Sequence, residues 1–392
     1  MISAILRIGI SGYRLLKDGF EINFLSRSKV PSETLSSEVL QIDKSLYTFR
    51  TIGLVGRNAS GKSTVLELIK KAHTYLETGR LLCLNSDFHK DEIKLSIDFY
   101  LDGFVYFYDV VFTQNDPSPM LLSFCLIKKE RLKRIKYRSA KGKKILELKD
   151  DAEDVSYEFL SRSLPDSSAI VTLTKGHFPV DEFTDNNFIT ADQFLLRGTF
   201  FQSLTRCKPS FSIALLRLLD DSIEELKILP NGWVSFKRFN EAKVKIRSDN
   251  LIPLLSKGTF RGLELFVRAM AALKKGGTLI VDEIEDSLNK SLVDNLFFFF
   301  NDASRNKKGA KLIFSTHYFE VLDILNRQDS IFITHKNEGK IDVKNMGGDY
   351  DVRTELLKSK ALYNDTFDTN LNYQLLMNLV EEMDNELLVD NN

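Results

Sequence analysis

Apolar and polar residues alternate with period two over much of the first half of the chain, which is the spacing of strands that bury one face. This pattern predicts strands at residues 4–10, 20–25, 93–99, 104–112 and 121–127. Leu101-Asp102-Gly103 separates the third strand from the fourth, so these two are expected to form a hairpin. The Ser-rich residues 26–45 predict a loop with little defined structure.

The spacing becomes helical in the middle of the chain and then alternates between helices and strands. Helices are predicted at residues 151–163, 191–202 and 211–226, followed by strands at 233–236 and 243–247. From residue 253 the predicted order is helix 259–274, strand 278–281, helix 288–305, strand 311–315, helix 320–326 and strand 331–334. Such alternation is typical of an α/β fold with a parallel sheet. No heptad repeat is sustained, so no coiled-coil arm is expected.

Composition narrows the class of protein. At 392 residues the chain can bury one large core or two smaller ones. Lys and Arg total 54, as do Asp and Glu, so net charge does not draw the whole protein to nucleic acid. Three cysteines without paired spacing argue against a disulfide framework or a zinc site. The N-terminus lacks a signal peptide and no apolar run is long enough to span a bilayer, so we expect a cytoplasmic protein without a membrane partner.

One segment departs from this balance. Residues 128–149 hold eleven Lys and Arg but only two acidic residues. Lys141-Gly142-Lys143 is expected to be the turn of a basic hairpin, with Ile145, Leu146 and Leu148 in its second strand. The hairpin could be a solvated edge whose charges prevent pairing with other sheets. It could instead be a patch that contacts the backbone of DNA or RNA, although Tyr137 is its sole aromatic residue and gives little support for base stacking.

The stretch Gly56-Arg57-Asn58-Ala59-Ser60-Gly61-Lys62-Ser63 fits the phosphate-loop pattern of Gly, four residues, then Gly-Lys-Ser/Thr. It lies between an apolar strand at residues 52–55 and a helix predicted at 64–71, so a chance match in a glycine-containing turn is the weaker interpretation. Backbone N–H groups of the loop and of the helix start, Thr64 included, would face the phosphates of a nucleotide. Lys62 would reach the β- and γ-phosphates, and Ser63 would place its hydroxyl on Mg²⁺.

Three further stretches can complete a nucleotide site. The apolar strand at 278–281 ends in Asp282-Glu283, where Asp282 would hold Mg²⁺ and Glu283 would act as general base, unless both are ordinary solvated acids at a strand end. Ser256 and Gly258 open a predicted helix and suit a γ-phosphate, which a two-fold dimer would bring to them from a second copy of the chain. His317 follows a strand and could contact the γ-phosphate or simply be a satisfied turn histidine.

Together these four stretches resemble the ATP-binding-cassette (ABC) type of ATPase head. The branch contains SMC-like repair proteins, the overcoming-lysogenization-defect (OLD) family and the bacterial AAA-family ATPases of abortive-infection systems. The similarity to this last group rests on Gly-x-Asn-Ala-Ser-Gly-Lys-Ser in the loop, or Walker A motif, Ser-x-Gly-Thr at Ser256, Asp-Glu at Asp282 and Ser-Thr-His ending at His317. Asn289 stands where the group often has His, which puts any role for a histidine there in doubt.

The resemblance implies a domain organisation. An ATPase head would contain residues 1–120, with the Walker A loop and a β lobe, and residues 251–345, with the signature, the catalytic acids and the switch histidine. Residues 121–250 would be an inserted lobe of β-hairpins and helices. Residues 346–392 would be a helical extension with an acidic tail.

The resemblance also implies a Mg²⁺-dependent ATPase that works as a homodimer or higher oligomer, with ATP held between subunits. Members of the group often act with a separately encoded effector, a nuclease or toxin, in antiviral defence against phage. Only 57 residues follow residue 335, too few for a fused nuclease, which favours such an effector here.

An SMC-like DNA-binding repair or maintenance ATPase is the alternative, favoured by residues 128–149 and disfavoured by the missing coiled coil. A transporter motor fits less well, because Leu255 to Thr259 only partly matches a Leu-Ser-Gly-Gly-Gln turn. A phosphotransferase acting on a small molecule is a formal possibility for any phosphate-loop protein.

Overall fold

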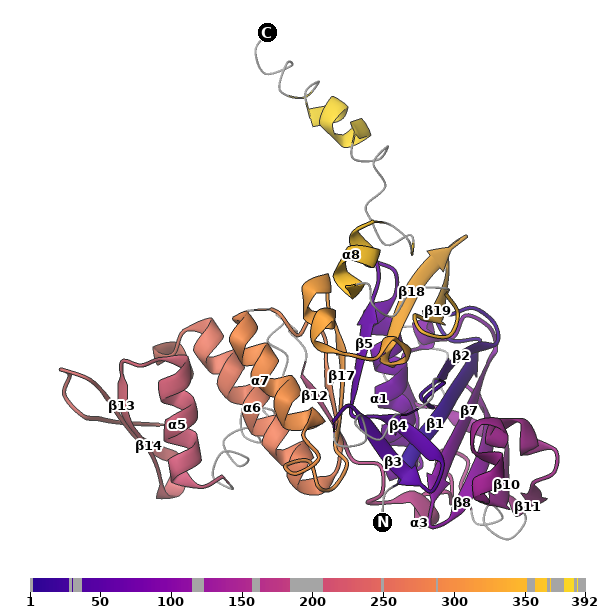
Figure 1. Ribbon diagram of the computed structural model, residues 1–392. Coiled ribbons are helices and arrows are strands. Elements are labelled where there is room, and N and C mark those ends of the chain that lie inside the picture. Colours follow the sequence, from indigo (N-terminus) through magenta and orange to yellow (C-terminus); the bar gives the residue numbers. More distant parts are fainter. Residues whose placement is uncertain are drawn as a thin grey trace.

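The structure is a computed structural model of the 392-residue chain. The residues that it describes are 3–27, 30, 37–114, 123–156, 163–183, 207–247, 250–286, 288–350, 357–364, 367, 377–383 and 386. The predicted helix at 191–202 lies outside these residues. Figure 1 shows the phosphate-loop strand near the middle of the molecule, with one lobe on either side of it.

A six-stranded sheet forms the centre, in the order β12-β16-β17-β5-β18-β19. The strands are β12 (Val180–Phe183), β16 (Thr278–Val281), β17 (Lys311–Ser315), β5 (Thr51–Val55), β18 (Ile331–Asn337) and β19 (Lys340–Asn345). All neighbours are parallel except β19, which pairs antiparallel with β18. The continuous apolar character of β5, β16 and β17 follows from burial of both faces of the sheet. The predicted α/β fold and these three strands are confirmed.

Helices cover both faces of this sheet. On one face, α1 (Lys62–Thr78) packs in a core shared with an antiparallel sheet. On the other face, α6 (Lys257–Lys275) and α7 (Lys290–Asn301) share a second core with the alternate residues of the strands. Helices α1 and α6 each begin two residues before the predicted start, and α1 extends beyond its predicted end at residue 71. Helix α7 is shorter than predicted because Asn289 caps its start and the chain turns extended at Asp302.

The antiparallel sheet has the order β11-β10-β8-β7-β1-β2. Its strands are β1 (Ala4–Ser11), β2 (Phe20–Asn23), β7 (Glu92–Leu101), β8 (Phe104–Thr113), β10 (Leu126–Lys136) and β11 (Glu153–Asp154). The predicted hairpin is β7–β8. The loop prediction for 26–45 is wrong in part, because β3 (Val39–Asp43) pairs with β4 (Leu46–Phe49). A two-stranded ladder joins β6 (Leu82–Cys83) to β9 (Ser123–Phe124).

The basic hairpin predicted around residue 142 is wrong. Residues Ser139–Lys149 form a 3-10 helix, and β10 pairs instead with β8 and β11. Ile145 is buried against Val105 and Phe107, with Leu146 packed beside it, so these apolar side chains cover the sheet face rather than extend its edge. Alternation over three residues could not separate the two arrangements, since helical and strand spacing coincide over so short a run.

A third sheet, β13-β14-β15, stands apart from the other two (Figure 1). It comprises β13 (Ile223–Leu229), β14 (Trp233–Arg238) and β15 (Val244–Arg247), and α5 (Pro209–Leu219) packs against it. The helix predicted to reach residue 226 ends early. Asp220 accepts hydrogen bonds from the backbone N–H and the hydroxyl of Ser222, a turn that competes with helix continuation.

Other helix predictions also need correction. Residues 153–154 form a strand rather than the start of a helix, and residues 157–162 lie outside the described part of the chain. The helix predicted at 320–326 is a 3-10 helix, Phe319–Ile324. The short helix α3 (Val171–Thr174) was not predicted, whereas α8 (Lys358–Tyr363) lies within the predicted helical extension at 346–392. The domain boundaries stay a prediction, but β10 and β12, both within 121–250, pair with strands of the two larger sheets.

Candidate functional site

The loop between β5 and α1 has a backbone that needs its glycines. Gly56 has a φ of 153°, and a Cβ there would lie 2.4 Å from Thr334 Oγ1. Gly61 has a φ of 103°, and a Cβ there would lie 2.6 Å from Ile341. Ala59 adopts a left-handed φ of 59°. The loop is therefore held against β18 and β19. Its Ser60 N–H donates to the Arg57 carbonyl (3.1 Å), and a turn of this kind points its other N–H groups toward an anion.

Lys62 is the first residue of α1 and is only 5% exposed. Its Nζ donates to the carbonyl oxygens of Gly56 (3.0 Å) and Arg57 (3.1 Å). Burial lowers the pKa of Lys62, while Asp282 and Glu283 act in the opposite direction. The ammonium group of Lys62 therefore packs against the carbonyl oxygens of the loop.

The remaining loop residues divide into support and exposed surface. The Ser60 hydroxyl lies 2.6 Å from that of Thr334, which in turn donates to the Val55 carbonyl (3.1 Å). Asn58 and Ser63 are exposed, and the first turn of α1 contains no acidic residue. Ser63 and Thr64 therefore stand at a helix start whose partial positive charge is not neutralised locally.

The two predicted catalytic acids lie at the same sheet edge as the loop. Strand β17 separates β16 from β5, so the acids are not adjacent to the loop strand but one strand away. Ser315, at the end of β17, fills the gap: its hydroxyl donates to Asp282 and accepts from the backbone N–H of Glu283 (2.8 Å). Ser315 is thus a positioning residue, although in the sequence it stands out only as part of the Ser-Thr-His motif.

His317 joins the acids to the loop. Its Nδ1 lies 3.5 Å from Lys62 Nζ, and its Nε2 lies 3.3 Å from Glu283 Oε1. An ammonium can only donate, so Nδ1 accepts and Nε2–H faces the carboxylate. Glu283 has a left-handed φ of 51°, an uncommon conformation for a non-glycine residue. The arrangement brings Lys62, Glu283 and His317 together as predicted candidates of one site.

Glu285 is a member of this cluster that sequence reasoning did not single out. Its Oε1 accepts from the backbone N–H of His317 (2.6 Å). Its Oε2 is buried without a hydrogen-bond partner in the described part of the chain. Because a buried carboxylate oxygen without a partner is costly, it marks a place where a donor or cation from a ligand would be stabilising.

Ser256 and Gly258 occupy a different setting. Ser256 is the N-cap of α6, where its hydroxyl accepts from the Thr259 N–H (3.0 Å). It is exposed, and Gly258 is half-buried. Behind them, Arg261 donates to the Asp286 carbonyl (3.0 Å) and lies over the Phe183 ring at 4.6 Å. The N-terminus of α6 is therefore exposed to solvent, and the contacts of Arg261 fix its position.

A pocket missed by sequence reasoning lies between the residues that follow β1 and those that precede β7. It has a volume of about 350 Å³ and is lined by Arg14, Leu15, Ser86, Asp87, Phe88 and His89. Arg14 donates to Asp87 and to Glu67 of α1. The Leu15 carbonyl accepts from Ile341 N, and Ile341 abuts Gly61, so the pocket adjoins the loop. Tyr13 is fully buried, which assigns it to packing rather than to stacking on a ligand.

The donors present suit a magnesium–nucleotide complex. The Ser63 hydroxyl and the Asp282 carboxylate are oxygen ligands of the kind that Mg²⁺ prefers. Three or more His, Cys, Asp or Glu side chains do not gather into a metal site anywhere in the described ranges. Mg²⁺ is commonly held by one or two protein groups together with substrate phosphates, so this donor set fits the ion.

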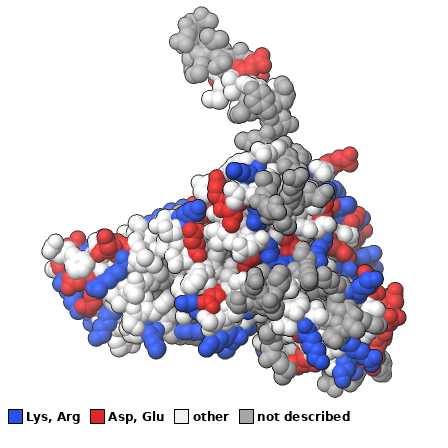
Figure 2. Space-filling view, in the orientation of Figure 1, with Lys and Arg blue, Asp and Glu red and all other residues white. Residues whose placement is uncertain are grey.

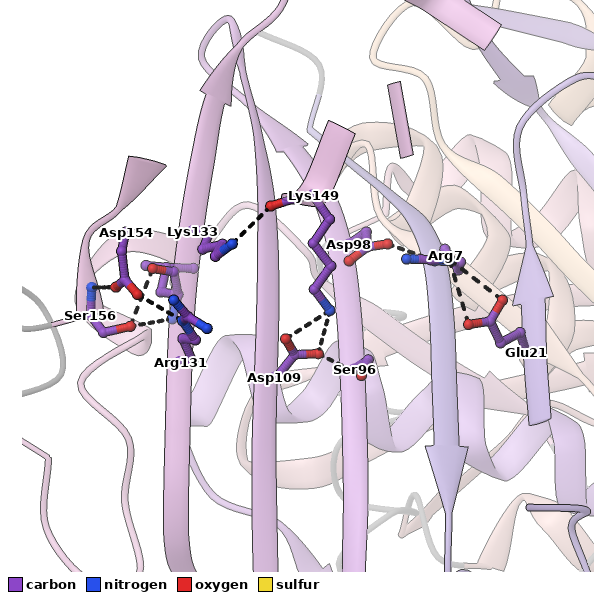
Figure 3. Close-up of polar contacts among 11 residues, drawn as sticks. Arg7, Glu21, Ser96, Asp98, Asp109, Arg131, Lys133, Lys149, Asp154 and Ser156 are labelled. Carbon is purple, nitrogen blue, oxygen red and sulfur yellow. Dashed lines mark hydrogen bonds and ion pairs between the residues drawn. The ribbon is translucent and has the colours of Figure 1, made fainter. Parts of the chain in front are cut away.

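Four of the eleven basic residues of 128–149 form ion pairs with carboxylates of the antiparallel sheet, and Figure 3 draws those of Arg131 and Lys149. Lys149 binds Asp109 (2.7 Å) and Arg131 binds Asp154 (2.7 Å). Lys128 pairs with Glu92 and Arg134 with Glu153. Basic and acidic side chains are interspersed over the face drawn in Figure 2. The pairing favours the structural interpretation of this segment over a nucleic-acid patch.

Comparisons with known proteins bear on this site. A family model described as "AAA domain, putative AbiEii toxin, Type IV TA system" matches residues 52–323, a span that includes every site residue from Gly56 to His317. A search of curated proteins gives no match. The matching solved structures include the SMC head domain from Thermotoga maritima, at 13% identity, covering 90% of this chain and 100% of that chain with a TM-score of 0.40. No helix among the described residues is long and apolar enough to cross a membrane.

Proposed function

The chain belongs to the AAA-domain family whose model matches residues 52–323, and on this basis we propose that it is a Mg²⁺-dependent ATPase. The observation that carries the proposal is the line of contacts from Lys62 through His317 to Glu283. It connects the phosphate-binding loop to a carboxylate at the end of a neighbouring strand. Such a connection supports the proposal that a cation for phosphate and a base for water act in one cluster.

Each residue has a role that follows from its chemistry. The loop from Gly56 to Thr64 binds phosphate through its N–H groups, and Lys62 exchanges its carbonyl partners for phosphate oxygens. Ser63 and Asp282 would hold Mg²⁺, which would supply positive charge next to the phosphates. Glu283 accepts a proton from the attacking water, and the half-exposed carboxylate is open to solvent for this purpose. We assign to His317, which contacts both Lys62 and Glu283, the role of sensing the γ-phosphate and holding Glu283.

The pocket beside the loop suits the nucleoside. Leu15 and Phe88 offer apolar surface, while Ser86 and His89 offer polar groups. Strand β19 connects it to the loop through Ile341, and Lys340 Nζ lies 2.5 Å from His89 Nε2. A nucleotide with its phosphates on the loop would then place its base in this pocket.

The exposed start of α6 supports a dimeric site. Ser256 and Gly258 offer a helix N-terminus without acidic residues, which favours a γ-phosphate delivered from another subunit. We propose that two copies hold two ATP molecules between them and that hydrolysis requires both copies.

The test is Glu283→Gln, with steady-state hydrolysis, ATP binding and mass in solution measured on the same preparation. Hydrolysis should fall by about 100-fold or more, because a general base contributes that much. ATP binding should persist, and a species of twice the monomer mass should accumulate with ATP. Unchanged hydrolysis would show that Glu283 is not the base. If hydrolysis is lost but the protein stays monomeric at all ATP concentrations, the proposed dimer is contradicted and the role of Glu283 as base is not.

The biological role that we propose is a nucleotide-gated component of a defence system that acts with a separately encoded effector. The support is the family description, which names a toxin and a toxin–antitoxin system. Co-expression of the chain with the product of the adjacent gene tests this. Association that depends on ATP and is retained in Glu283→Gln is expected. No association in any nucleotide state would remove the two-component role and leave the ATPase intact.

A DNA-binding repair ATPase of the SMC-like kind is the second candidate. Its sequence support was the basic segment 128–149, in which four of the eleven cations have carboxylate partners in the antiparallel sheet. The observation therefore lowers the weight of this candidate.

A further inference from the structure

The three-stranded sheet β13-β14-β15 buries one face and exposes the other. Val234 and Phe236 of β14 are buried with Leu226 of β13, and this face packs against α5 and α6 in a core containing Leu216 and Val267. Because side chains alternate across a strand, the residues between these face away from the core. On this outer face Lys227, Lys245 and Arg247 are exposed, Leu229 and Trp233 are half-buried, and Ser235 between them is buried.

The outer face is basic and carries the chain's single tryptophan. Cross-strand register places Trp233 between Leu229 and Arg247, and Lys245 opposite Ser235 on the same face. Lys245 Nζ lies 5.3 Å from the Trp233 ring centre and Arg247 Cζ lies 5.6 Å from it. Lys227 joins the face through its pairing with Ser235. Aromatic and cationic groups thus gather on one flat surface.

The charges on this face are unevenly compensated. At one end, Lys243 pairs with Glu225 (2.6 Å) and Lys237 with Glu224 (2.7 Å). Around Trp233, none of Lys227, Lys245 and Arg247 forms an ion pair with a carboxylate of the residues that the structure describes. The face is therefore locally positive where the tryptophan lies and neutral where it does not.

We propose that this face, defined by Lys227, Leu229, Trp233, Lys245 and Arg247, binds single-stranded nucleic acid. Three cations spaced along two strands match the regular charge of a phosphate backbone. An indole ring and the adjacent Leu229 match the apolar faces of unstacked bases, which a duplex does not offer. The sheet lies at the opposite end of the molecule from β10, so this surface is distinct from the segment 128–149 (Figure 1).

The single tryptophan makes the surface directly observable. Titration of the nucleotide-free protein with an oligothymidylate of about 12 nucleotides should quench Trp233 fluorescence saturably. The logarithm of the affinity should fall with the logarithm of salt concentration with a slope of about −2, since three contacts contribute about −0.7 each. Equal affinity for a duplex of the same length would overturn the preference for single strands.

Variants separate charge from stacking, with anisotropy of a labelled oligonucleotide as the readout. Lys245→Ala/Arg247→Ala should weaken binding and reduce the salt slope by about 1.4. Trp233→Leu should weaken binding about tenfold while leaving the slope unchanged. Lys129→Ala/Lys136→Ala removes two exposed cations from β10 and should have no effect. Thermal unfolding of each variant verifies folding.

Three outcomes would overturn the proposal. One is the absence of saturable binding by the unmodified protein at low salt. Another is tighter binding of an acidic polypeptide, polyglutamate, than of the oligonucleotide, which would show that the face takes an acidic protein. The third is loss of binding in the β10 variant with full binding in the β15 variant, which would return the interaction to 128–149. None of these depends on ATP hydrolysis, so the proposed ATPase can stand or fall separately.

Discussion

Helices α1 and α6 each begin with a lysine that follows a Gly or Ser cap, yet their starts are built in opposite ways. Lys62 is buried and its ammonium bonds to the loop behind it, whereas Lys257 is exposed. Gly61 caps α1 without a side-chain hydrogen bond, whereas Ser256 caps α6 through its hydroxyl. Neither first turn contains an acidic residue. Both ends are therefore able to attract an anion.

The difference shows which half of the proposed site is complete within one chain. The start of α1 is surrounded by Thr334, Ile341 and His317, so its geometry is set by the fold. The start of α6 is satisfied by its own cap and faces outward. A ligand would bind first at α1, and α6 would contribute only when a second surface brings the ligand to it. Substitutions at the two ends should accordingly separate binding from turnover.

The largest expected effect is at the α1 start. Lys62→Met should lower ATP affinity by about 100-fold, because two hydrogen bonds from a charged donor to phosphate are lost. Lys257→Met makes the same change at the α6 start and should leave affinity for the monomer unchanged. Isothermal titration with ATP measures both. Equal losses in the two variants would contradict the division between the two ends.

The next effect is at the α6 cap. Ser256→Asp keeps a good capping residue and so preserves the helix, but it places a carboxylate where a γ-phosphate is proposed to lie. Hydrolysis and ATP-dependent dimer formation should fall about tenfold or more, because like charges at an interface cost several kcal/mol. ATP binding by the monomer should persist. Asn289→Asp, the corresponding change at the cap of α7, is the matched control and should leave hydrolysis unaltered.

A smaller effect is expected at Ser315. This residue ends β17 and orients the two acids that lie beside the phosphate loop. Ser315→Ala removes the donor to Asp282 and the acceptor for the Glu283 N–H. Hydrolysis should fall about tenfold and more Mg²⁺ should be needed for half-maximal rate, since a hydrogen bond to a charged group contributes about 1.5–3 kcal/mol. Ser330→Ala, another fully buried serine, bonds only to a carbonyl and should have normal activity. Equal rates in both variants would remove the positioning role.

Much of this architecture could be predicted because its signals are local. The buried strand at 52–55, the glycine-containing loop and the helix after it are contiguous in sequence, and so are β16 and its two acids. The hairpin β7–β8 was predictable for the same reason. What could not be predicted depends on contacts between distant segments. Ser315 supports Asp282, and Ile341 abuts Gly61, only because β17 and β19 take particular places in the sheet.

The basic segment 128–149 also shows that contacts between distant segments could not be predicted. Its charge was evident, but whether the cations were paired depended on Asp109, Asp154 and Glu92 of neighbouring strands. The basic face at Trp233 was missed because its cations are spread over β13 and β15 rather than concentrated in one run. Runs of charge in the sequence therefore overstate the positive charge of 128–149 and do not reveal the basic face at Trp233.

The smallest expected effect concerns the anchoring of α1 in the core. His73 is fully buried on α1, and its Nδ1 lies 3.2 Å from the Phe178 carbonyl, so the neutral ring donates there. Burial lowers the pKa of His73 to about 4. Below pH 6.5 the unfolded chain takes up a proton that the folded chain excludes, so this contribution to stability is present at neutral pH and is lost as the pH falls from 6.5 toward 4.

His73→Gln keeps a donor for the carbonyl but removes the titration. Relative to this variant, the unmodified protein should lose about 1.4 kcal/mol of unfolding free energy between pH 7.5 and pH 5.5. Urea denaturation of both proteins at both pH values measures the difference in unfolding free energy. The effects of the other titrating groups are common to both proteins and cancel in this difference. A difference that does not change with pH would show that His73 is accessible to protons in the folded state. Helix α1 would then be less firmly held in the core, and its start would be less rigid than we infer from the comparison with α6.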